Sequence, residues 1–145
     1  MLEIAVVVCL MLILMLIAIP IIQGTLYMYR LRSAVAAVTW AVQSTRYQAL
    51  MEGYPFQVTF SAANNTYQLA SDPTNSGTFA NVGGAIPISS NAITLSATEA
   101  MQFKPYGAVI GSGTTLPPPS FQISYMGSSK TILVSYYGNV TVTSP

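Results

Sequence analysis

Hydrophobic and polar positions follow three successive patterns along the chain. Residues 4–22 are all apolar, a continuous run of 19 residues. In residues 24–53, apolar side chains recur at spacings of three and four, which predicts an amphipathic helix. From residue 54 onward, segments such as "FQVTF" alternate between apolar and polar side chains, a period of two that is typical of β-strands.

The apolar run is long enough to cross a bilayer, which needs about 20 residues. A cleaved signal peptide is excluded, because it would begin with basic residues and end at a small-residue cleavage site. Here no basic residue precedes Glu3, and the run leads into Pro20 instead. An ordinary transmembrane anchor stays open as an alternative, but it explains neither the carboxylate at the mouth of the run nor the proline near its end.

The amphipathic segment has a defined apolar stripe and a clear end. The stripe consists of Leu31, Ala34, Val35, Val38, Ala41, Val42, Thr45 and Ala49. Gly53, followed by Tyr54 and Pro55, is a helix stop signal. Proline lacks a backbone donor and glycine is conformationally free, so Pro20 and Gly24 predict a helix break within an otherwise continuous helix of about 50 residues.

The remainder of the chain predicts an antiparallel sheet of the α+β fold class, with a long N-terminal α-helix packed on it. Turn signals and a loop at Pro117-Pro118-Pro119 separate the strand-like segments "FQVTF", "TYQLA", "MQFKPYGAVI", "FQISYM", "TILVSYY" and "VTV". We interpret these segments as a β-meander with one face packed on the helix. Three parts are expected: residues 1–23 as a hydrophobic transmembrane helix, residues 24–53 as its amphipathic half, and residues 54–145 as the antiparallel β domain.

Charge and composition exclude several classes of function. Only 6% of the residues are charged and the net charge is +1, so no strong field exists to attract nucleic acid or anionic lipid. Histidine is absent from the sequence, Cys9 is the single cysteine, and Gly83-Gly84 is an isolated turn signal rather than a phosphate-binding loop. We therefore expect no enzymatic activity and no cofactor, and we assign no catalytic, cofactor-binding or metal-ligating residues.

The N-terminal segment "MLEIAVVVCLMLILMLIAIP" resembles the mature amino terminus of type IV pilins and type II secretion pseudopilins. In that family a glutamate opens an apolar helix and a proline falls near its end, as Glu3 and Pro20 do here. The resemblance implies a processed chain whose basic leader has been removed, and a methylated N-terminus. It also implies that Glu3 pairs with the N-terminal amine of a neighbouring subunit.

A subunit of this family polymerises through its N-terminal helix, so we expect a structural pilin-like subunit of a pilus-like filament. The implied partners are other copies of the chain and the pilus or secretion assembly machinery. The implied location is the bacterial inner membrane before assembly, and afterwards an extracellular filament or a periplasmic pseudopilus. A lone carboxylate in hydrocarbon is costly, so an intramembrane acid is expected to have a partner and a function.

The globular part leaves two alternatives open. The passage "TRYQALMEGYPFQVTF" resembles the end of the helix and the first strand of H-type minor pseudopilins and related minor pilins. The chain is therefore either the repeating subunit of a filament, which we favour, or a minor pseudopilin at the tip of a type II secretion pseudopilus. A DNA-uptake minor pilin is disfavoured, because only Lys104 and Lys130 supply positive charge after residue 53 and phosphate contacts need clusters of basic side chains.

Two asparagines are candidate glycosylation sites. Asn64 and Asn139 each begin an N-x-[ST] sequence, Asn64-Asn65-Thr66 and Asn139-Val140-Thr141. Both sequences coincide with turn signals, Asn64-Asn65 and Gly138-Asn139.

Overall fold

The computed structural model describes residues 2–89, 93–111 and 120–144. The chain divides into two units, residues 1–30 and residues 31–145, and the second is called the globular unit below. A single helix, α1 (Leu2–Glu52), supplies all the helical structure of the described residues. The predicted stop signal is confirmed, because α1 ends one residue before Gly53, which adopts a φ of 74°.

Two antiparallel sheets follow the helix. The five-stranded sheet has the order β3-β2-β1-β5-β6 and the four-stranded sheet has the order β4-β7-β8-β9. The strands are β1 (Phe56–Ser61), β2 (Thr66–Ser71), β3 (Ala80–Pro87), β4 (Thr94–Leu95), β5 (Glu99–Phe103), β6 (Val109–Gly111), β7 (Ser120–Tyr125), β8 (Ser128–Val134) and β9 (Val140–Thr143). The predicted α+β class is confirmed, whereas the predicted loop at residues 117–119 lies outside the described residues.

The sheet order differs from a simple meander. β1 pairs with β2 through a hairpin register that joins Phe56 to Ser71, but its other neighbour is β5, in a register that joins Phe56 to Phe103. The short strand β4 and the last three strands, β7 to β9, form a second sheet. The rings of Phe60 and Phe121 meet across the two sheets with centroids 5.2 Å apart. Periodicity identifies strands but carries no information about pairing between distant segments, so the sequence could not distinguish these arrangements.

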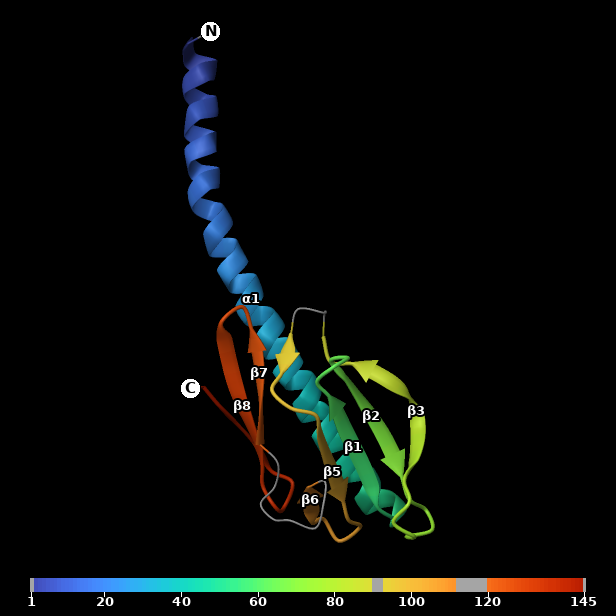
Figure 1. The fold of residues 1–145 in the computed structure, drawn as a ribbon. Coiled ribbons are helices and arrows are strands. Elements are labelled where there is room, and N and C mark those ends of the chain that lie inside the picture. The colour runs from blue at the N-terminus through green and yellow to red at the C-terminus, as the bar shows by residue number, and fades with distance from the viewer. Residues whose placement is uncertain (1, 90–92, 112–119, 145) are drawn as a thin grey trace. The chain divides into compact units, whose positions relative to one another are not determined.

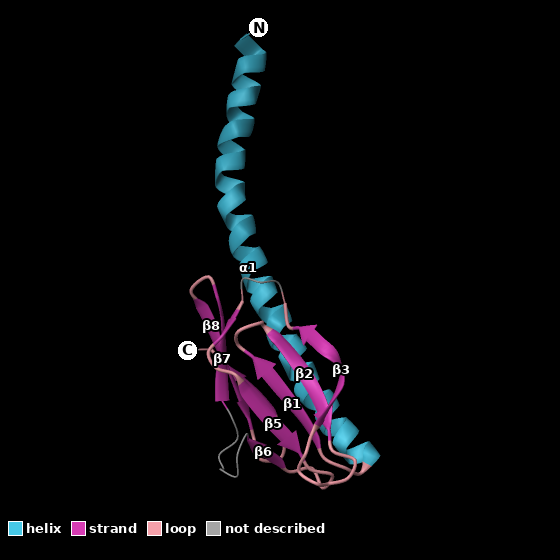
Figure 2. Ribbon diagram, turned by 45° about the vertical axis from the view of Figure 1, so that its right-hand side comes forward, coloured by secondary structure: helices cyan, strands magenta, loops and turns pink. Residues whose placement is uncertain are grey.

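The predicted stripe of α1 forms one side of the core of the globular unit. Seven of its eight residues are buried, and Val35 is half-buried. The strands present their alternate buried residues toward the helix, as in β1, where Phe56, Val58 and Phe60 are buried. Figures 1 and 2 show both sheets covering the same side of the second half of α1. Thr45 is accommodated because its hydroxyl donates a hydrogen bond of 2.6 Å to the carbonyl of Ala41.

The turn between β8 and β9 contacts both α1 and the first sheet. The backbone amide of Val109 in β6 donates to the carbonyl of Tyr136 at 2.8 Å, which joins the two sheets. Gly138 has a φ of 77°, and a Cβ at this position would lie 2.7 Å from Cδ of Arg46 on α1. Only glycine satisfies both the left-handed backbone and this close approach.

Candidate assembly site

The apolar part of α1 has no cover within its own unit. Every side chain described from Leu2 to Ile17 is exposed, and Leu16 is 73% exposed. By length and composition α1 is able to cross a membrane. A helix that is apolar all round is stable only when lipid or other protein surrounds it. These residues are therefore a surface that another molecule or a bilayer must cover.

Glu3 lies in the first turn of α1 with its side chain exposed. The four backbone N–H groups of the first turn give this end of the helix a partial positive charge, which favours a carboxylate there. In hydrocarbon, however, a lone carboxylate still costs about 2.5–3.5 kcal/mol or more. If this end of α1 lies in hydrocarbon, the carboxylate of Glu3 therefore needs a positively charged partner.

The helix assignment continues through Pro20 and Gly24, so the single chain does not contain the expected interruption. One proline removes only one backbone donor, and the flanking turns of this apolar helix keep their own hydrogen bonds. The side chain of Pro20 lies outside the described part of the structure, and a Cβ at Gly24 would meet nothing within 4 Å. A departure from α-helix in the assembled state therefore stays a prediction.

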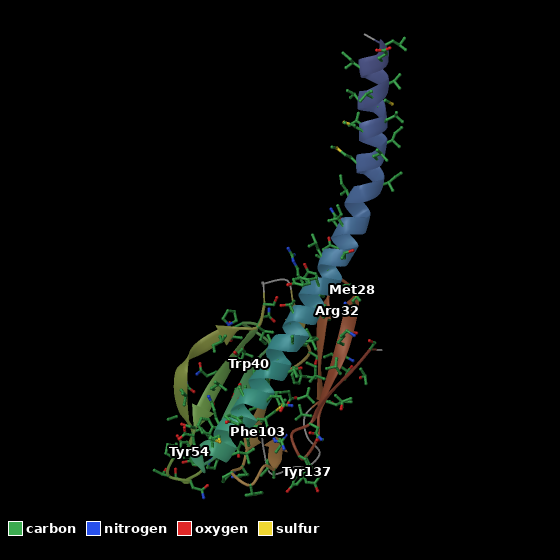
Figure 3. All side chains as sticks on the ribbon, turned by 180° about the vertical axis from the view of Figure 1, so that it is seen from behind. Met28, Arg32, Trp40, Tyr54, Phe103 and Tyr137 are labelled. Atoms are coloured by element: carbon green, nitrogen blue, oxygen red, sulfur yellow. The ribbon has the colours of Figure 1, made fainter. Side chains whose placement is uncertain are left out.

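The outward face of the globular part of α1 carries large apolar side chains. Trp40 and Tyr47 are each 62% exposed, and Met51 is 67% exposed. Figure 3, which views the molecule from behind, shows α1 in front of the sheets with Trp40 on its outer side. The spacing of seven residues between Trp40 and Tyr47 was the available signal, because it places both on one helical face.

Asp72 organises the loop between β2 and β3, a role that sequence reasoning also missed. Its side chain is buried, and it accepts hydrogen bonds from the backbone amide of Gly77 at 2.7 Å, the backbone amide of Ser76 at 3.1 Å and the Thr74 hydroxyl at 3.1 Å. Burial alone would raise the pKa of Asp72, but these hydrogen bonds outweigh it and hold the pKa below its ordinary value. The signal was the sequence "DPTNSG", which is rich in turn-forming residues.

The two candidate glycosylation sites lie exposed in turns, as a modifying enzyme requires. Asn64 is in the turn between β1 and β2. Asn139 is in the turn between β8 and β9, where its backbone amide donates to the Ser135 hydroxyl at 3.0 Å. Modification at either position stays a prediction. Within the described residues, no group of His, Cys, Asp or Glu side chains is arranged to hold a metal ion.

No protein-family model and no curated protein matches the chain. Solved structures do match its fold. The type IV minor pilin FimU from Pseudomonas aeruginosa is similar with a TM-score of 0.60 at 17% identity, and the match covers 79% of this chain and 92% of that chain. The minor pseudopilin EpsH from the type 2 secretion system of Vibrio cholerae is similar in two structures. One has a TM-score of 0.57 at 12% identity, covering 78% of this chain and 97% of that chain. The other has a TM-score of 0.60 at 11% identity, covering 83% of this chain and 96% of that chain.

The chain therefore shares the fold of a type IV minor pilin and of a minor pseudopilin, which confirms the fold that the sequence resemblance implies. Among the described residues, its N-terminal helix is long and apolar enough to cross a membrane.

Proposed function

We propose that the chain is a structural subunit that polymerises through the first half of α1 into a type IV pilus-like filament. The observation that carries this proposal is the exposure of the apolar half of α1, which opens with Glu3. In the membrane before assembly, lipid covers the helix. In the filament, the helices of neighbouring copies replace the lipid, and no apolar surface is returned to water.

Glu3 acts as a register device in this assembly. As helices pack, its carboxylate pairs with the positively charged N-terminal amine of a neighbouring copy. A wrong register would leave both charges unpaired in an apolar surrounding. The free-energy cost of those unpaired charges is much larger than the net stabilisation from the correct pair. Glu3 therefore selects one arrangement of the helices and contributes little to the stability of the globular unit.

The substitution Glu3→Ala tests this proposal in the full chain, expressed together with a pilus or secretion assembly system. Removing one partner of a buried pair costs about 3–5 kcal/mol, so filament yield should fall by on the order of a hundredfold or more. The yield is measured by electron microscopy and immunoblotting of filaments sheared from the cell surface. Glu52→Ala is the matched control, because Glu52 is an exposed glutamate at the other end of α1.

The control should assemble normally, and the Glu3→Ala chain should accumulate in the membrane with a folded globular unit. Normal filament yield from Glu3→Ala would contradict the charge-pairing mechanism. Failure of the parent chain to form filaments of its own would contradict the role as a repeating subunit.

A second candidate function is a minor pseudopilin or minor pilin at the tip of a filament. The specific observation in its favour is that the matched structures, FimU and EpsH, are both minor subunits. The two roles differ in stoichiometry. Immunogold labelling of isolated filaments distinguishes them, since a repeating subunit labels the whole length and a tip subunit labels one end only.

A further inference from the structure

The two sheets of the globular unit have four edge strands among the described residues: β3 and β6 in one sheet, β4 and β9 in the other. An edge strand offers unpaired backbone N–H and C=O groups, which invite another strand to pair with it. Soluble proteins usually protect such edges with charges, with short strands or with a covering segment. The four edges of this unit are protected very unequally.

Two of the four edges are already blunted. The three-residue strand β6 is joined to the β8–β9 turn, because the amide of Val109 donates to the carbonyl of Tyr136. The strand β4 has only two residues, and just after it the hydroxyl of Ser96 accepts from the amide of Gln122 at 2.9 Å. The edge at β6 is therefore already bonded to another part of the unit, and the edge at β4 is only two residues long.

The edge at β3 is open and uncharged. All eight of its residues are exposed, and residues 73–98 contain no charged side chain. A bulge divides the strand: between the pairs Val82–Leu69 and Ile86–Tyr67, β3 advances by four residues while β2 advances by two. The side chain of Gln68 donates to the carbonyl of Gly83 at 3.2 Å and so fills the bulge from the inner side. The segment Ala80–Val82 is a regular edge that no other described strand pairs with, although the carbonyl of Val82 also accepts from the Gln68 side chain at 3.5 Å.

The edge at β9 has the same character. Three of its four residues are exposed, and residues 131–145 contain no charged side chain. The nearest cation, Lys130 on β8, is directed to the end of the strand, where its ammonium donates to the Ser144 hydroxyl at 2.8 Å. Figures 1 and 2 show β3 at one flank of the globular unit and β8, whose outer neighbour is β9, at the opposite flank.

We infer that the β9 edge of one copy pairs with the β3 edge of the next copy, forming a sheet that continues from subunit to subunit. This inference rests on the proposed filament function. In such a filament each copy has two neighbours related to it by the same operation, so one edge can contact the preceding copy and the other edge the following copy. The two edges differ from each other and lie on opposite flanks, and a contact between unlike surfaces continues from copy to copy as an open filament unless its rotation closes a ring. A β3–β3 contact would instead close a two-fold dimer.

Each pairing spans only a few residues, so a single contact is weak. The N-terminal helices hold neighbouring copies together, which raises the effective concentration of the two edges and makes the contact intramolecular in practice. The edges therefore stiffen and orient an assembly that the helices create. This division explains why long uncharged edges are tolerated on a chain with so few charged residues.

Charge substitutions in the full chain test the pairing. Val82→Lys on β3 or Val142→Lys on β9 places a cation at one open edge, and each should lower filament yield by about fivefold or more. Val82→Lys combined with Val142→Glu should restore the yield, because the contact between unlike edges brings opposite charges together. Leu133→Lys is the matched control, since Leu133 is equally exposed but lies on β8, which has partners on both sides.

Cross-linking identifies the partner strand directly. In a Cys9→Ser background, Val82→Cys is combined with Thr141→Cys or with Val142→Cys, because adjacent strands hold Cα atoms at about the 4.5–5.5 Å that a disulfide accepts. Oxidised filaments of at least one pair should give a ladder of covalent oligomers, and each single-cysteine chain should remain monomeric on a non-reducing gel.

The outcomes separate this inference from the proposed function. Dimers from Val82→Cys alone would show a β3–β3 contact and overturn it. The inference would also be overturned if both lysine variants formed filaments at normal yield and the filaments of the double-cysteine chains gave no covalent ladder. That result would leave the helix-driven assembly intact. A parent chain that never forms filaments would contradict the proposed function, and this inference with it.

Discussion

Both halves of α1 are helical, but their apolar side chains differ in how far they are exposed. Leu16 in the first half is 73% exposed, whereas Leu31 in the second half is 2% exposed. The first half is apolar on every side, and the second half has an apolar stripe that the sheets cover. The distribution of apolar residues around the helix therefore decides whether a half packs on the sheets or presents an apolar surface on all sides.

The comparison also separates two kinds of stability. The stripe of the second half stabilises the globular unit, since burying each Val or Leu side chain contributes roughly 1.5–3 kcal/mol. The described apolar residues 2–17 are exposed, and in the proposed function lipid or neighbouring copies cover them. The globular unit should therefore fold alone, and the first half should matter only for insertion and assembly.

Removing the first half altogether should have the largest effect. A shortened chain that begins at Gly24 should be soluble, folded and monomeric, because it keeps the stripe and its covering strands. It should form no filaments at all, because the intermolecular helix core has been removed. Size-exclusion chromatography and circular dichroism measure the first claim, and electron microscopy measures the second. An unfolded product would mean that the stripe does not stabilise the sheets, and filaments would place the main assembly surface in the globular unit.

A matched pair of leucine substitutions tests the same contrast within the full chain. Leu31→Ala should lower the free energy of unfolding by about 2–5 kcal/mol, because it leaves a cavity in the core. Leu16→Ala should change that free energy by no more than about 0.5 kcal/mol, because the side chain is exposed. Thermal unfolding in detergent micelles gives both values. Equal effects at the two positions would remove the distinction between the halves.

Pro20 should matter in the filament rather than in the single chain. Its missing donor weakens the helix by about 3 kcal/mol, so close packing with neighbours is expected to extend the chain between Pro20 and Gly24. Pro20→Ala should keep this segment helical in the assembled state. Helical reconstruction by electron cryomicroscopy compares the two filaments. An unbroken helix in the parent filament would rule out the expected extension.

The smallest effect concerns Asp72 and pH. Its pKa is lowered in the folded state, so its contribution to stability is complete above the unfolded-state pKa of about 3.9 and is lost as pH falls through the lower folded value. The midpoint temperature of thermal unfolding of the shortened chain should therefore decrease when the pH is lowered below about 4. Asp72→Asn should lower the midpoint at neutral pH and flatten this fall. An identical pH profile in the two proteins would show that the loop does not depend on the carboxylate.

Much of the fold was predictable because it depends on neighbouring residues. The spacing of Leu31, Val38 and Val42 predicted the buried face of α1, and the alternation in "FQVTF" predicted β1. The candidate assembly residue Glu3 was also evident, since an acid at the mouth of an apolar run is costly wherever the fold places it. Asp72 and the outward row of Trp40 and Tyr47 were missed, because their roles depend on which surfaces the fold covers.

The sequence by itself determined the two hydrophobic patterns of α1, the positions of most strands and the absence of charge along β3 and β9. Only the tertiary structure decided that β5 pairs with β1, that a second sheet forms, and that β3 and β9 become open edges on opposite flanks. The physical reason is the range of the interactions. Periodicity is a property of adjacent residues, whereas an edge is defined by the pairing of segments such as Phe56 and Phe103, far apart along the chain.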